Sequence, residues 1–452
     1  MKVTLSGFNM EVHEHPVRTP EVLTAAYARV SRSEKTLSEL REAARENVEK
    51  ARRSNESIVY DMGHASIAEH AFFNIDIEDV SRLALEELEK HRLASYTEKS
   101  QRYVKLDSDW HQPAEWREKS QELAQLHAEA VAFYKDLMAA GVAAEDARYY
   151  LPLVVTGQVG LSCNARSAEH LILRLAASPF AEARDLAEQL FGVLTPVVPS
   201  LIRYVEPSEW IRREEAAGWH LLASEQTRLE ENVSFEGVPV GRLDLITPPD
   251  DWDALVLAHG AVRAGAPFAA AVAGARALSP EGRAEAFSRM TGGMSVHDPA
   301  PRPWEHVSLT WEWVLSAAAF AQLKRHRLAG ITSAAYDPAL GFTHPAAAGH
   351  AFADRARALV KLSEQTAALI DGPAGVYALL SGHRRRLTWT ANLRETLHFS
   401  RLREDAHAQW DIRAFAAALS AVVREHAPLC GRLFGGKDAF AGRTPFAGRT
   451  LP

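Results

Sequence analysis

The chain has 452 residues, which is long enough for two or more domains with substantial cores. Lysine and arginine number 51 against 58 aspartates and glutamates, and the formal net charge of −7 argues against general binding to nucleic acid or to anionic membrane. A hydrophobic fraction of 47% with 24% charged residues is typical of a soluble globular protein and excludes a disordered chain.

The sequence carries no pattern typical of export or of membrane insertion. Residues Met1–Val12 alternate as a strand would and lack the basic-then-apolar layout of a signal peptide. The most apolar stretch, Ala264–Leu278, contains Arg276 and is too short to span a bilayer. The two cysteines, Cys163 and Cys430, provide no disulfide framework and indicate a reducing compartment. We therefore expect a cytoplasmic protein.

Beyond the N-terminal strand, the predicted elements are mostly long helices. Alternating strand patterns run through Phe72, Asn74 and Asp76 and over Val307–Leu315. Each of these strands precedes a predicted helix that ends in a His-Arg-Leu-Ala sequence, at residues 91–94 and 326–329. Helical periodicity also extends over Arg41–Arg53, Lys119–Ala139, Pro179–Leu194, Phe352–Leu369 and His407–Val423. The predicted class is α+β, with helices dominating.

Three landmarks recur in the same order and indicate a tandem duplication. The pairs are Glu69-His70 with Glu305-His306, His91-Arg92-Leu93-Ala94 with His326-Arg327-Leu328-Ala329, and Asn164-Ala165-Arg166 with Asn392-Leu393-Arg394. The members of the three pairs lie 236, 235 and 228 residues apart, and each asparagine precedes a histidine, His170 or His398, by six residues. The predicted repeats are residues 1–225 and 238–452.

The densest polar segment of the first repeat runs from Lys90 to Tyr103. One interpretation is a helix end with basic residues near its last carbonyls, followed by a solvated loop. Against it, Glu98, Ser100 and Arg102 alternate, so an extended loop would point all three side chains the same way. A cation, a hydroxyl and backbone amides on one side favour a phosphate-binding loop.

These segments together resemble the flavin-dependent thymidylate synthases. In the first repeat the resemblance rests on Ala28-Arg29-Val30-Ser31, on Gly63 to His70, on His91-Arg92 with Ser95, Glu98, Ser100 and Arg102, and on Arg148 before Leu151-Pro152. In the second it rests on Gln322, Arg325-His326-Arg327, Asn392-Leu393-Arg394-Glu395, His398, Leu402-Arg403 and His407-Ala408-Gln409-Trp410. The resemblance implies a helix-rich fold with an antiparallel sheet, present twice. It also implies FAD as cofactor and conversion of dUMP to dTMP with methylenetetrahydrofolate and NADPH.

The resemblance assigns a role to each matched residue. Arg403 is the expected catalytic residue, whose guanidinium would stabilise negative charge on the pyrimidine. The expected dUMP-binding residues are Glu98, Ser100, Gln101, Arg102 and Arg148 from the first repeat, with Gln322 and Arg325 from the second. The expected FAD-binding residues are Ser31, His64, Ser66, Glu69, Arg325, His326, Arg327, Asn392, Arg394 and His398. No metal is expected, because the His-Glu-x-x-His spacing is missing.

The two repeats depart from the family pattern in complementary ways. The first has Glu87, Lys90 and Leu175 where the family has Gln, Arg and the catalytic Arg, and Arg174 lies one position off. The second has Ser333, Ala335, Asp337 and Val376 in place of Glu98, Ser100, Arg102 and Arg148, and Ala300 and Arg302 in place of His64 and Ser66. We expect one composite site built from both repeats and a dead reciprocal site. Because the family is homotetrameric, a homodimer of this chain would form a pseudo-tetramer of repeats.

Other interpretations stay open at this point. The chain could be a catalytically silent flavin- or nucleotide-binding homologue with a sensing or scaffolding role. Nucleic-acid binding through Lys90–Arg102 and His383–Arg386 is disfavoured by the net charge. The run His383–Arg386 is predicted to be a solvated face, with a contact to folate glutamates as the alternative. Both cysteines are predicted to be small buried hydrophobes, so no cysteine nucleophile is expected.

Overall fold

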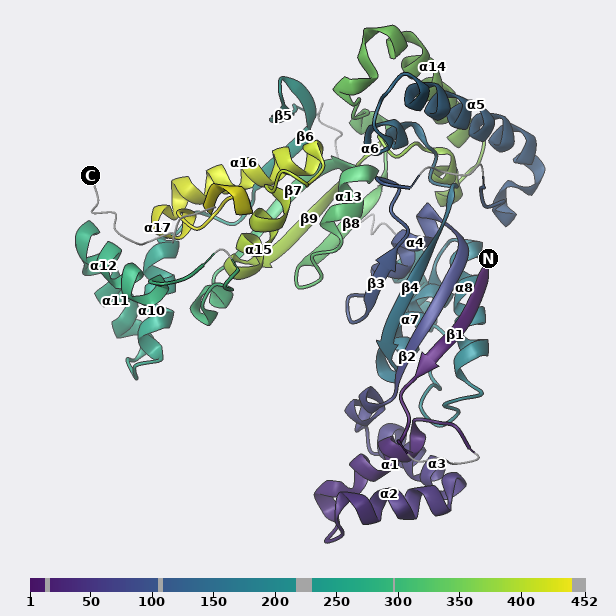
Figure 1. The fold of residues 1–452 in the computed structure, drawn as a ribbon, viewed down its shortest axis with the longest axis vertical. Helices are drawn as coiled ribbons and strands as arrows, with labels where there is room; N and C mark the ends of the chain where they lie inside the picture. Colours follow the sequence, from purple (N-terminus) through teal and green to yellow (C-terminus); the bar gives the residue numbers. More distant parts are fainter. Residues whose placement is uncertain (13–16, 105–108, 217–229, 296, 441–452) are drawn as a thin grey trace. The chain divides into compact units, whose positions relative to one another are not determined.

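The computed structural model describes residues 1–12, 17–104, 109–216, 230–295 and 297–440 (Figure 1). Within these ranges the chain forms two compact units. The first unit contains the described residues up to 216 together with 353–380, and the second contains 230–352 together with 381–440. The predicted boundary between the repeats begins at residue 225, which lies outside the described residues, so it stays a prediction.

The first unit is built on a four-stranded antiparallel sheet. Its strands are β1 (Lys2–Phe8), β2 (Phe72–Ser81), β4 (Thr156–Asn164) and β3 (Ser95–Glu98), in that spatial order. Along β2, Phe73, Ile75 and Ile77 are buried while Asn74 and Asp76 are exposed, as a period of two requires. Helices α7 (Ala165–Ala177) and α8 (Ala181–Leu194) run alongside the sheet (Figure 1).

Three short helices form a lobe at the end of this sheet (Figure 1): α1 (Glu21–Arg29), α2 (Leu37–Glu46) and α3 (Val48–Glu56). The prediction of one helix over Arg41–Arg53 was wrong, because the chain breaks at Asn47. That residue has φ −145° and ψ 83°, and its side-chain Oδ1 accepts a hydrogen bond from the Lys50 backbone at 2.9 Å. Asn47 therefore acts as the N-cap of a new helix.

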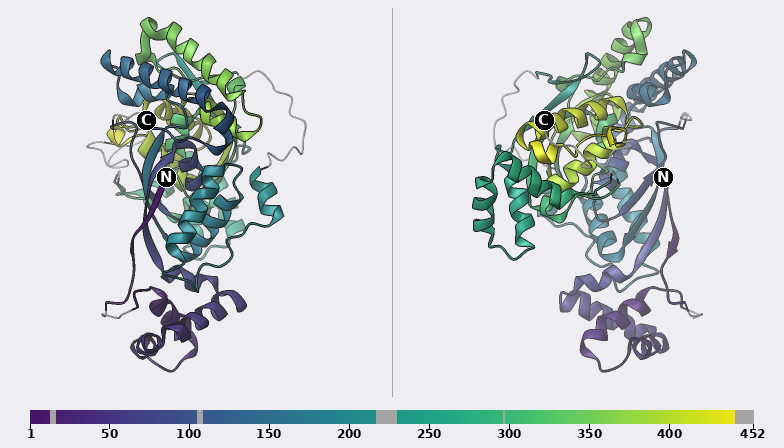
Figure 2. Two further views of the ribbon diagram at one scale, coloured as in Figure 1. Left: turned by 90° about the vertical axis from the view of Figure 1, so that its right-hand side faces the viewer. Right: turned by 60° about the vertical axis from the view of Figure 1, so that its left-hand side comes forward.

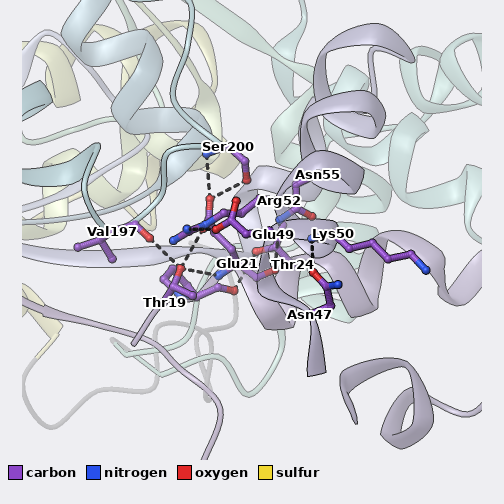
Figure 3. Close-up of polar contacts among 11 residues, drawn as sticks. Thr19, Glu21, Thr24, Asn47, Glu49, Lys50, Arg52, Asn55, Val197 and Ser200 are labelled. Atoms are coloured by element: carbon purple, nitrogen blue, oxygen red, sulfur yellow. Dashed lines mark hydrogen bonds and ion pairs between the residues drawn. The ribbon is translucent and has the colours of Figure 1, made fainter. Parts of the chain in front are cut away.

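A buried carboxylate attaches this lobe to the rest of the unit (Figure 3). Glu21 Oε1 accepts hydrogen bonds from the backbone nitrogen and hydroxyl of Ser200 at 2.9 and 2.6 Å. Glu21 Oε2 accepts one from Arg52 Nε at 2.6 Å, and Asn55 donates to the Glu21 carbonyl at 3.2 Å. Because Glu21 is fully buried, these partners replace the water that the carboxylate would otherwise need.

The first unit contains several further helices. They are η2 (Ser57–Asp61), η3 (Ala65–His70), α4 (Arg82–Glu89), α5 (Ser120–Ala139), α6 (Ala144–Ala147), η5 (Arg148–Tyr150) and α9 (Glu209–Ala216), with the short turns η1 (Val30–Arg32) and η4 (Ala114–Lys119). From the second repeat come α14 (Gly349–Ala367), whose residues from 353 onward lie in this unit, and η9 (Pro373–Ala378).

We call residues 353–380 the exchanged segment, because it belongs to the second repeat by sequence and to the first unit by packing. The Leu153 and Val154 backbone nitrogens donate to the carbonyls of Leu379 and Tyr377 at 2.9 and 3.1 Å. Pro152 pairs with Leu380, its own counterpart 228 residues later. Helices α5 and α14 lie side by side, with Arg355 paired to Asp136 and placed 5.1 Å from the Phe133 ring (Figure 2).

The second unit repeats this plan. Its sheet has the order β5 (Val233–Phe235), β6 (Val238–Leu245), β7 (Ser308–Ser316), β9 (Arg384–Asn392) and β8 (Gly330–Tyr336). Its helices are α10 (Trp252–Val262), α11 (Phe268–Ala277), α12 (Pro280–Thr291), α13 (Ala317–Leu323), α15 (Leu393–Arg403), α16 (Trp410–His426) and α17 (Pro428–Gly431). Short turns are η6 (Arg302–His306), η7 (Pro338–Leu340), η8 (Ala346–Ala348) and η10 (Lys437–Phe440). Trp313, Trp389 and Phe399 meet in its core.

The strand registers confirm the tandem repeat. Phe72 pairs with Asn164 in the first sheet, and Ser308 pairs with Asn392 at the same place in the second. Both asparagines accept a hydrogen bond from the third residue of the following helix, at 2.8 and 2.9 Å. The one-residue difference in spacing comes from a bulge in β2 at Asp79, which has φ 55°, whereas β7 pairs without interruption.

Two further predictions need correction. Helices α4 and α13 end at Glu89 and Leu323, so both His-Arg-Leu-Ala motifs lie after the helix and not at its end. The run His383–Arg386 is not a solvated face, because it leads into β9 and its first three side chains are at most 9% exposed. Among the described residues, no helix is long and apolar enough to cross a membrane.

Candidate functional site

The predicted phosphate-binding loop follows strand β3 in the first unit. Glu98 ends this strand, and its side chain is 5% exposed and forms an ion pair with Arg82, the first residue of α4. The chain then turns at Gln101–Tyr103, and the Tyr103 and Val104 backbone nitrogens donate to the Ser100 carbonyl. The predicted extended conformation therefore holds only as far as Glu98. Glu98, Ser100 and Gln101 nevertheless line one small hollow of about 30 Å³.

The two arginines predicted to bind phosphate meet at Glu145. Arg102 donates from Nε and Nη2 to Glu145 Oε2, at 2.9 and 2.7 Å. Arg148 is 5% exposed and donates from Nε to the Glu145 carbonyl at 3.3 Å. The Arg102 backbone nitrogen also donates to Ser100 Oγ at 3.3 Å. Ser100, Arg102 and Arg148 thus form one connected group, in which the Glu145 carboxylate is the anionic partner of Arg102.

The segments predicted to bind flavin in the first unit lie next to each other. Ser31 in η1 and His64 and Ser66 around η3 are exposed. The rings of Tyr27 in α1 and His70 in η3 lie 4.7 Å apart and join the two segments. Hydroxyl and imidazole groups on one surface are donors that suit the phosphates and carbonyls of FAD.

Glu69, the fourth predicted flavin residue of this unit, has a partner of its own. It accepts a hydrogen bond from Arg166 Nη1 at 2.6 Å. The second unit has the same contact, because Arg394 forms an ion pair with Glu305. These matching pairs connect the predicted flavin segment to the first turn of α7 and of α15.

The catalytic candidate Arg403 ends helix α15 and is fixed by hydrogen bonds. Its Nε donates to His326 Nε2 at 3.2 Å, and its Nη2 donates to the Gln322 carbonyl at 3.0 Å. Gln322 is buried and donates from Nε2 to Gln409 Oε1 at 3.1 Å. Three predicted site residues, Gln322, His326 and Arg403, therefore come together within the second unit.

His326 is the centre of this network and is neutral. Its Nδ1 lies 3.0 Å from Glu395 Oε1, and the side chain is 2% exposed. Burial lowers the pKa of His326, although the hydrogen bond to Glu395 acts in the opposite direction. Because a guanidinium only donates, Nε2 must carry the lone pair that accepts from Arg403, and the proton resides on Nδ1.

The remaining candidates of the second unit lie around this network. Arg325 and Arg327 flank His326 and are exposed, and His398 is exposed five residues before Arg403. The His398 and His326 rings are 5.8 Å apart. Asn392 uses its Oδ1 to cap α15. Exposed planar cations of this kind can both stack on flavin and bind phosphate, so the donor set fits FAD.

The first unit lacks this arginine network at the corresponding place. Leu175 is buried where the second unit has Arg403. Arg174 pairs instead with Glu214 and Glu215 of α9, at 2.6 and 3.2 Å, and cannot replace it. His91 lies 3.3 Å from His170, between their Nδ1 atoms, and burial lowers the pKa of His91 to about 4. These groups line a hollow of about 330 Å³.

The second unit lacks, at the corresponding places, the residues that the sequence predicts to bind phosphate. Ser95 and Glu98 of β3 pair with Ser162 and Val159. At the same places in the second sheet, Gly330 and Ser333 of β8 pair with Thr390 and Leu387. Ser333 is therefore the structural counterpart of Glu98. Asp337, the counterpart of Arg102 by sequence count, accepts a hydrogen bond from the Ala339 backbone at 2.8 Å.

Both cysteines are buried, as predicted. Burial raises the pKa of the Cys163 thiol to about 12 and also raises the pKa of Cys430. Neither is therefore a reactive thiolate at neutral pH. Within the ranges that the structure describes, no group of three or more His, Cys, Asp or Glu side chains is placed to hold a metal ion.

Three residues of the site were given no role by the sequence. Glu395 and Gln409 belong to the quoted motifs, but only the structure places them against His326 and Gln322. Glu145 lies 43 residues from Arg102 and gave no signal of its own.

Comparison with known proteins identifies similar sequences in both repeats. A family model described as "Thymidylate synthase complementing protein" matches residues 12–200 and 266–429. Proteins named flavin-dependent thymidylate synthase are similar to parts of the chain. The Saccharolobus solfataricus protein is 34% identical over 151 residues, covering 32% of this chain and 58% of that protein. The Sulfurisphaera tokodaii protein is 31% identical over 186 residues, covering 39% and 72%.

The chain thus matches little more than half the length of some curated relatives. It is 38% identical to the Pyrococcus furiosus protein and covers 55% of that protein. Among solved structures, a Helicobacter pylori thymidylate synthase crystallised with FAD and dUMP aligns at 23% identity and a TM-score of 0.34. It covers 47% of this chain and all of that one. The UMP/dUMP methylase PolB from Streptomyces cacaoi aligns at 18% identity and a TM-score of 0.35, covering 44% and 92%.

Proposed function

Because the chain belongs to the thymidylate synthase complementing protein family, we propose that it is a flavin-dependent thymidylate synthase. It converts dUMP to dTMP, with methylenetetrahydrofolate as the carbon donor, and NADPH returns the flavin to its reduced form. Bound FAD supplies the hydride chemistry, and the protein supplies position and electrostatics. We further propose a cytoplasmic homodimer that contains four repeats.

The observation that carries this proposal is the complementary division of site groups between the repeats. The first repeat has the connected group Ser100, Arg102 and Arg148, and the second has Gln322, His326 and Arg403. Each group is incomplete in the other repeat, which lacks both arginines of the first group and the glutamine and arginine of the second. We propose that one nucleotide site takes its phosphate-binding residues from the first repeat and its pyrimidine-binding residues from the second.

The phosphate end of dUMP would bind to the Arg102 loop. Two guanidiniums and a hydroxyl can share the charge of a phosphate dianion, with Gln101 and Glu98 beside them. Glu145 holds Arg102 through two hydrogen bonds, so phosphate binding exchanges one anionic partner for another. The fixed phosphate then sets the position of the pyrimidine ring.

The pyrimidine end would face Arg403, whose Nη2 donates to the Gln322 carbonyl, with Arg325 next to His326 in the chain. Uracil C5 is a weak nucleophile, and its reactivity would rise as negative charge develops on the ring and its carbonyl oxygens. A guanidinium already fixed by His326 stabilises that charge without reorganising. The neutral His326 holds Arg403 in place and takes no part as a charged group.

FAD would be held by polar residues of both units, most of which are exposed. These are Ser31, His64, Ser66 and Glu69 in the first, with Arg325, His326, Arg327, Asn392, Arg394 and His398 in the second. Buried His326 would act on FAD indirectly, through the exposed arginines on either side of it.

The proposal is tested by incubating the protein with FAD, NADPH, methylenetetrahydrofolate and dUMP and measuring dTMP by mass spectrometry. Arg102→Ala and Arg403→Ala should each reduce turnover by at least about 100-fold, since each removes a charged contact in the transition state. Asp337→Ala is the matched control and should retain full turnover. Flavin binding without product would instead support a catalytically silent homologue, and full activity in Arg403→Ala would refute the composite site.

A further inference from the structure

The first repeat has a small hollow at its phosphate-binding loop, and three positions around it differ in kind in the second repeat. Leu85, Gln101 and Gly157 line this hollow. Their counterparts are Phe320, Tyr336 and Arg385. Phe320 follows Ser316 by four residues as Leu85 follows Ser81, and Arg385 matches Gly157 by strand register. Tyr336 matches Gln101 by sequence count from Ser333 and Glu98, across an irregularity in the pairing of β8. A leucine, an amide and a glycine are thus replaced by two aromatic rings and an arginine.

Gly157 is the position that determines whether the hollow is open. It pairs with Val80 of β2, and Arg385 pairs with Leu315 of β7 at the same register. A Cβ atom added at Gly157 would lie 3.4 Å from Leu85 Cδ1, which itself lines the hollow. Any longer side chain at this position would therefore extend into the space that the hollow provides.

Arg385 is such a side chain, and its contacts hold it in place. The guanidinium carbon lies 4.7 Å from the centre of the Phe320 ring and 4.3 Å from that of Tyr336. Both Nε and Nη2 donate to the Ala334 carbonyl, at 2.8 and 2.6 Å. The residue is 9% exposed, and both rings are buried as well. A planar cation between aromatic rings is a favourable packing arrangement.

The neighbouring residues keep this arrangement rigid. Arg384 is 2% exposed, pairs with Glu231 and donates from Nε to Thr343 Oγ1 at 2.9 Å. Asp337 donates its backbone nitrogen to the Arg384 carbonyl at 2.9 Å, so the end of β8 and the start of β9 are tied together. The side chain of Arg385 is therefore not on a surface from which a ligand could easily displace it.

We propose that Arg385 fills the second repeat's counterpart of the hollow that Ser100 and Gln101 line beside the proposed phosphate-binding arginines, so that the protein binds one nucleotide per chain. The reciprocal site has not only lost its binding residues but is also occupied by a side chain of the protein. The identity of the nucleotide rests on the proposed function, whereas the filling of the hollow rests on contacts within the second unit alone.

The first experiment measures how many dUMP molecules bind per chain, by calorimetry on the FAD-loaded wild-type protein. One dUMP per chain supports the proposal, and two per chain would overturn it. An absence of binding would contradict the proposed function and not the filling of the hollow, which the second experiment decides without any nucleotide.

The second experiment removes the side chain and supplies its head group. Arg385→Gly recreates the glycine of the first repeat, and its melting temperature should fall by about 4 °C because a buried side chain is lost. Ethylguanidinium at about 10 mM should restore at least half of that loss by occupying the space between the two rings. Arg386→Gly is the matched control, because Arg386 is partly exposed and paired with Glu312, and it should show no recovery. Equal responses in the two variants, or no recovery in Arg385→Gly, would overturn the proposal.

Discussion

Replacement of Glu395 should lower turnover although this residue is expected to touch neither substrate nor flavin. Its carboxylate accepts from His326 Nδ1 at 3.0 Å, and His326 Nε2 accepts from Arg403 Nε at 3.2 Å. Glu395→Ala leaves a buried N–H without its acceptor, which costs about 1 to 3 kcal/mol. If the imidazole turns to recover a partner, Nε2 no longer holds Arg403, and kcat should fall by about 10- to 100-fold. Glu395→Gln keeps a neutral acceptor and should lose only about fivefold.

The pH dependence of these variants separates a positioning role from a structural one. Protonation of His326 removes the lone pair that accepts from Arg403, so kcat should decline on the acid side. Burial lowers the pKa of His326, and the Glu395 hydrogen bond partly opposes this. Removing the carboxylate charge therefore lowers that pKa further, and Glu395→Gln should show a lower plateau with its acid limb moved to lower pH.

The assay is dTMP formation between pH 5 and 9, with melting temperature recorded for each variant. The control is Glu425→Gln, which makes the same chemical change on an exposed face of α16 and should leave both the plateau and the acid limb unchanged. An acid limb that moves to higher pH in Glu395→Gln, or a kcat loss equal to that of Glu425→Gln, would refute the positioning of Arg403 through His326.

Three further predictions concern stability. Glu21→Ala should lower the free energy of unfolding by about 3 to 5 kcal/mol, since it leaves Arg52 and Ser200 without their buried carboxylate. The control Glu49→Ala, at an exposed partner of Arg52, should lower it by about 0.5 kcal/mol or less, and urea unfolding measures both. Tyr377→Phe removes a 2.9 Å hydrogen bond to buried Glu182 and should cost about 1 to 3 kcal/mol, and an unchanged urea midpoint would contradict this. Burial lowers the pKa of His91 to about 4 in the folded protein, so its contribution to the free energy of unfolding is fully present above about pH 6.5 and is lost as the pH falls toward 4. In a His91→Leu variant the free energy of unfolding should therefore fall less steeply over that pH range.

The duplication and most long helices could be predicted because they depend on local or repeated patterns. Lys119–Ala139 was predicted as a helix, and α5 spans Ser120–Ala139. The distance between the Glu-His and His-Arg-Leu-Ala landmarks is one residue longer in the first repeat, and the bulge at Asp79 is the cause. The helix break at Asn47 could also have been found, because asparagine is a preferred N-cap residue, which the periodicity alone does not register.

The buried basic run at the start of β9 could not be predicted from local sequence. Four consecutive basic residues normally indicate a solvated face, because unpaired buried charge is costly. The groups that make burial of Arg384 and Arg385 favourable lie far away in sequence, in Glu231, Phe320 and Tyr336. The same limit applies to the site, since the link from Glu145 to Arg102 and the link from Glu395 to His326 depend on tertiary structure.

The exchanged segment determines the order in which the protein can be completed during synthesis. The backbone of Leu153 and Val154 takes its partners from residues 377 and 379, more than two hundred positions later. At roughly 5 to 20 residues per second, the ribosome needs on the order of ten seconds or more to reach them after the first repeat has emerged. During that interval the Leu153 and Val154 backbone nitrogens lack these partners, and most of the second repeat is made before the first unit has all of its native contacts.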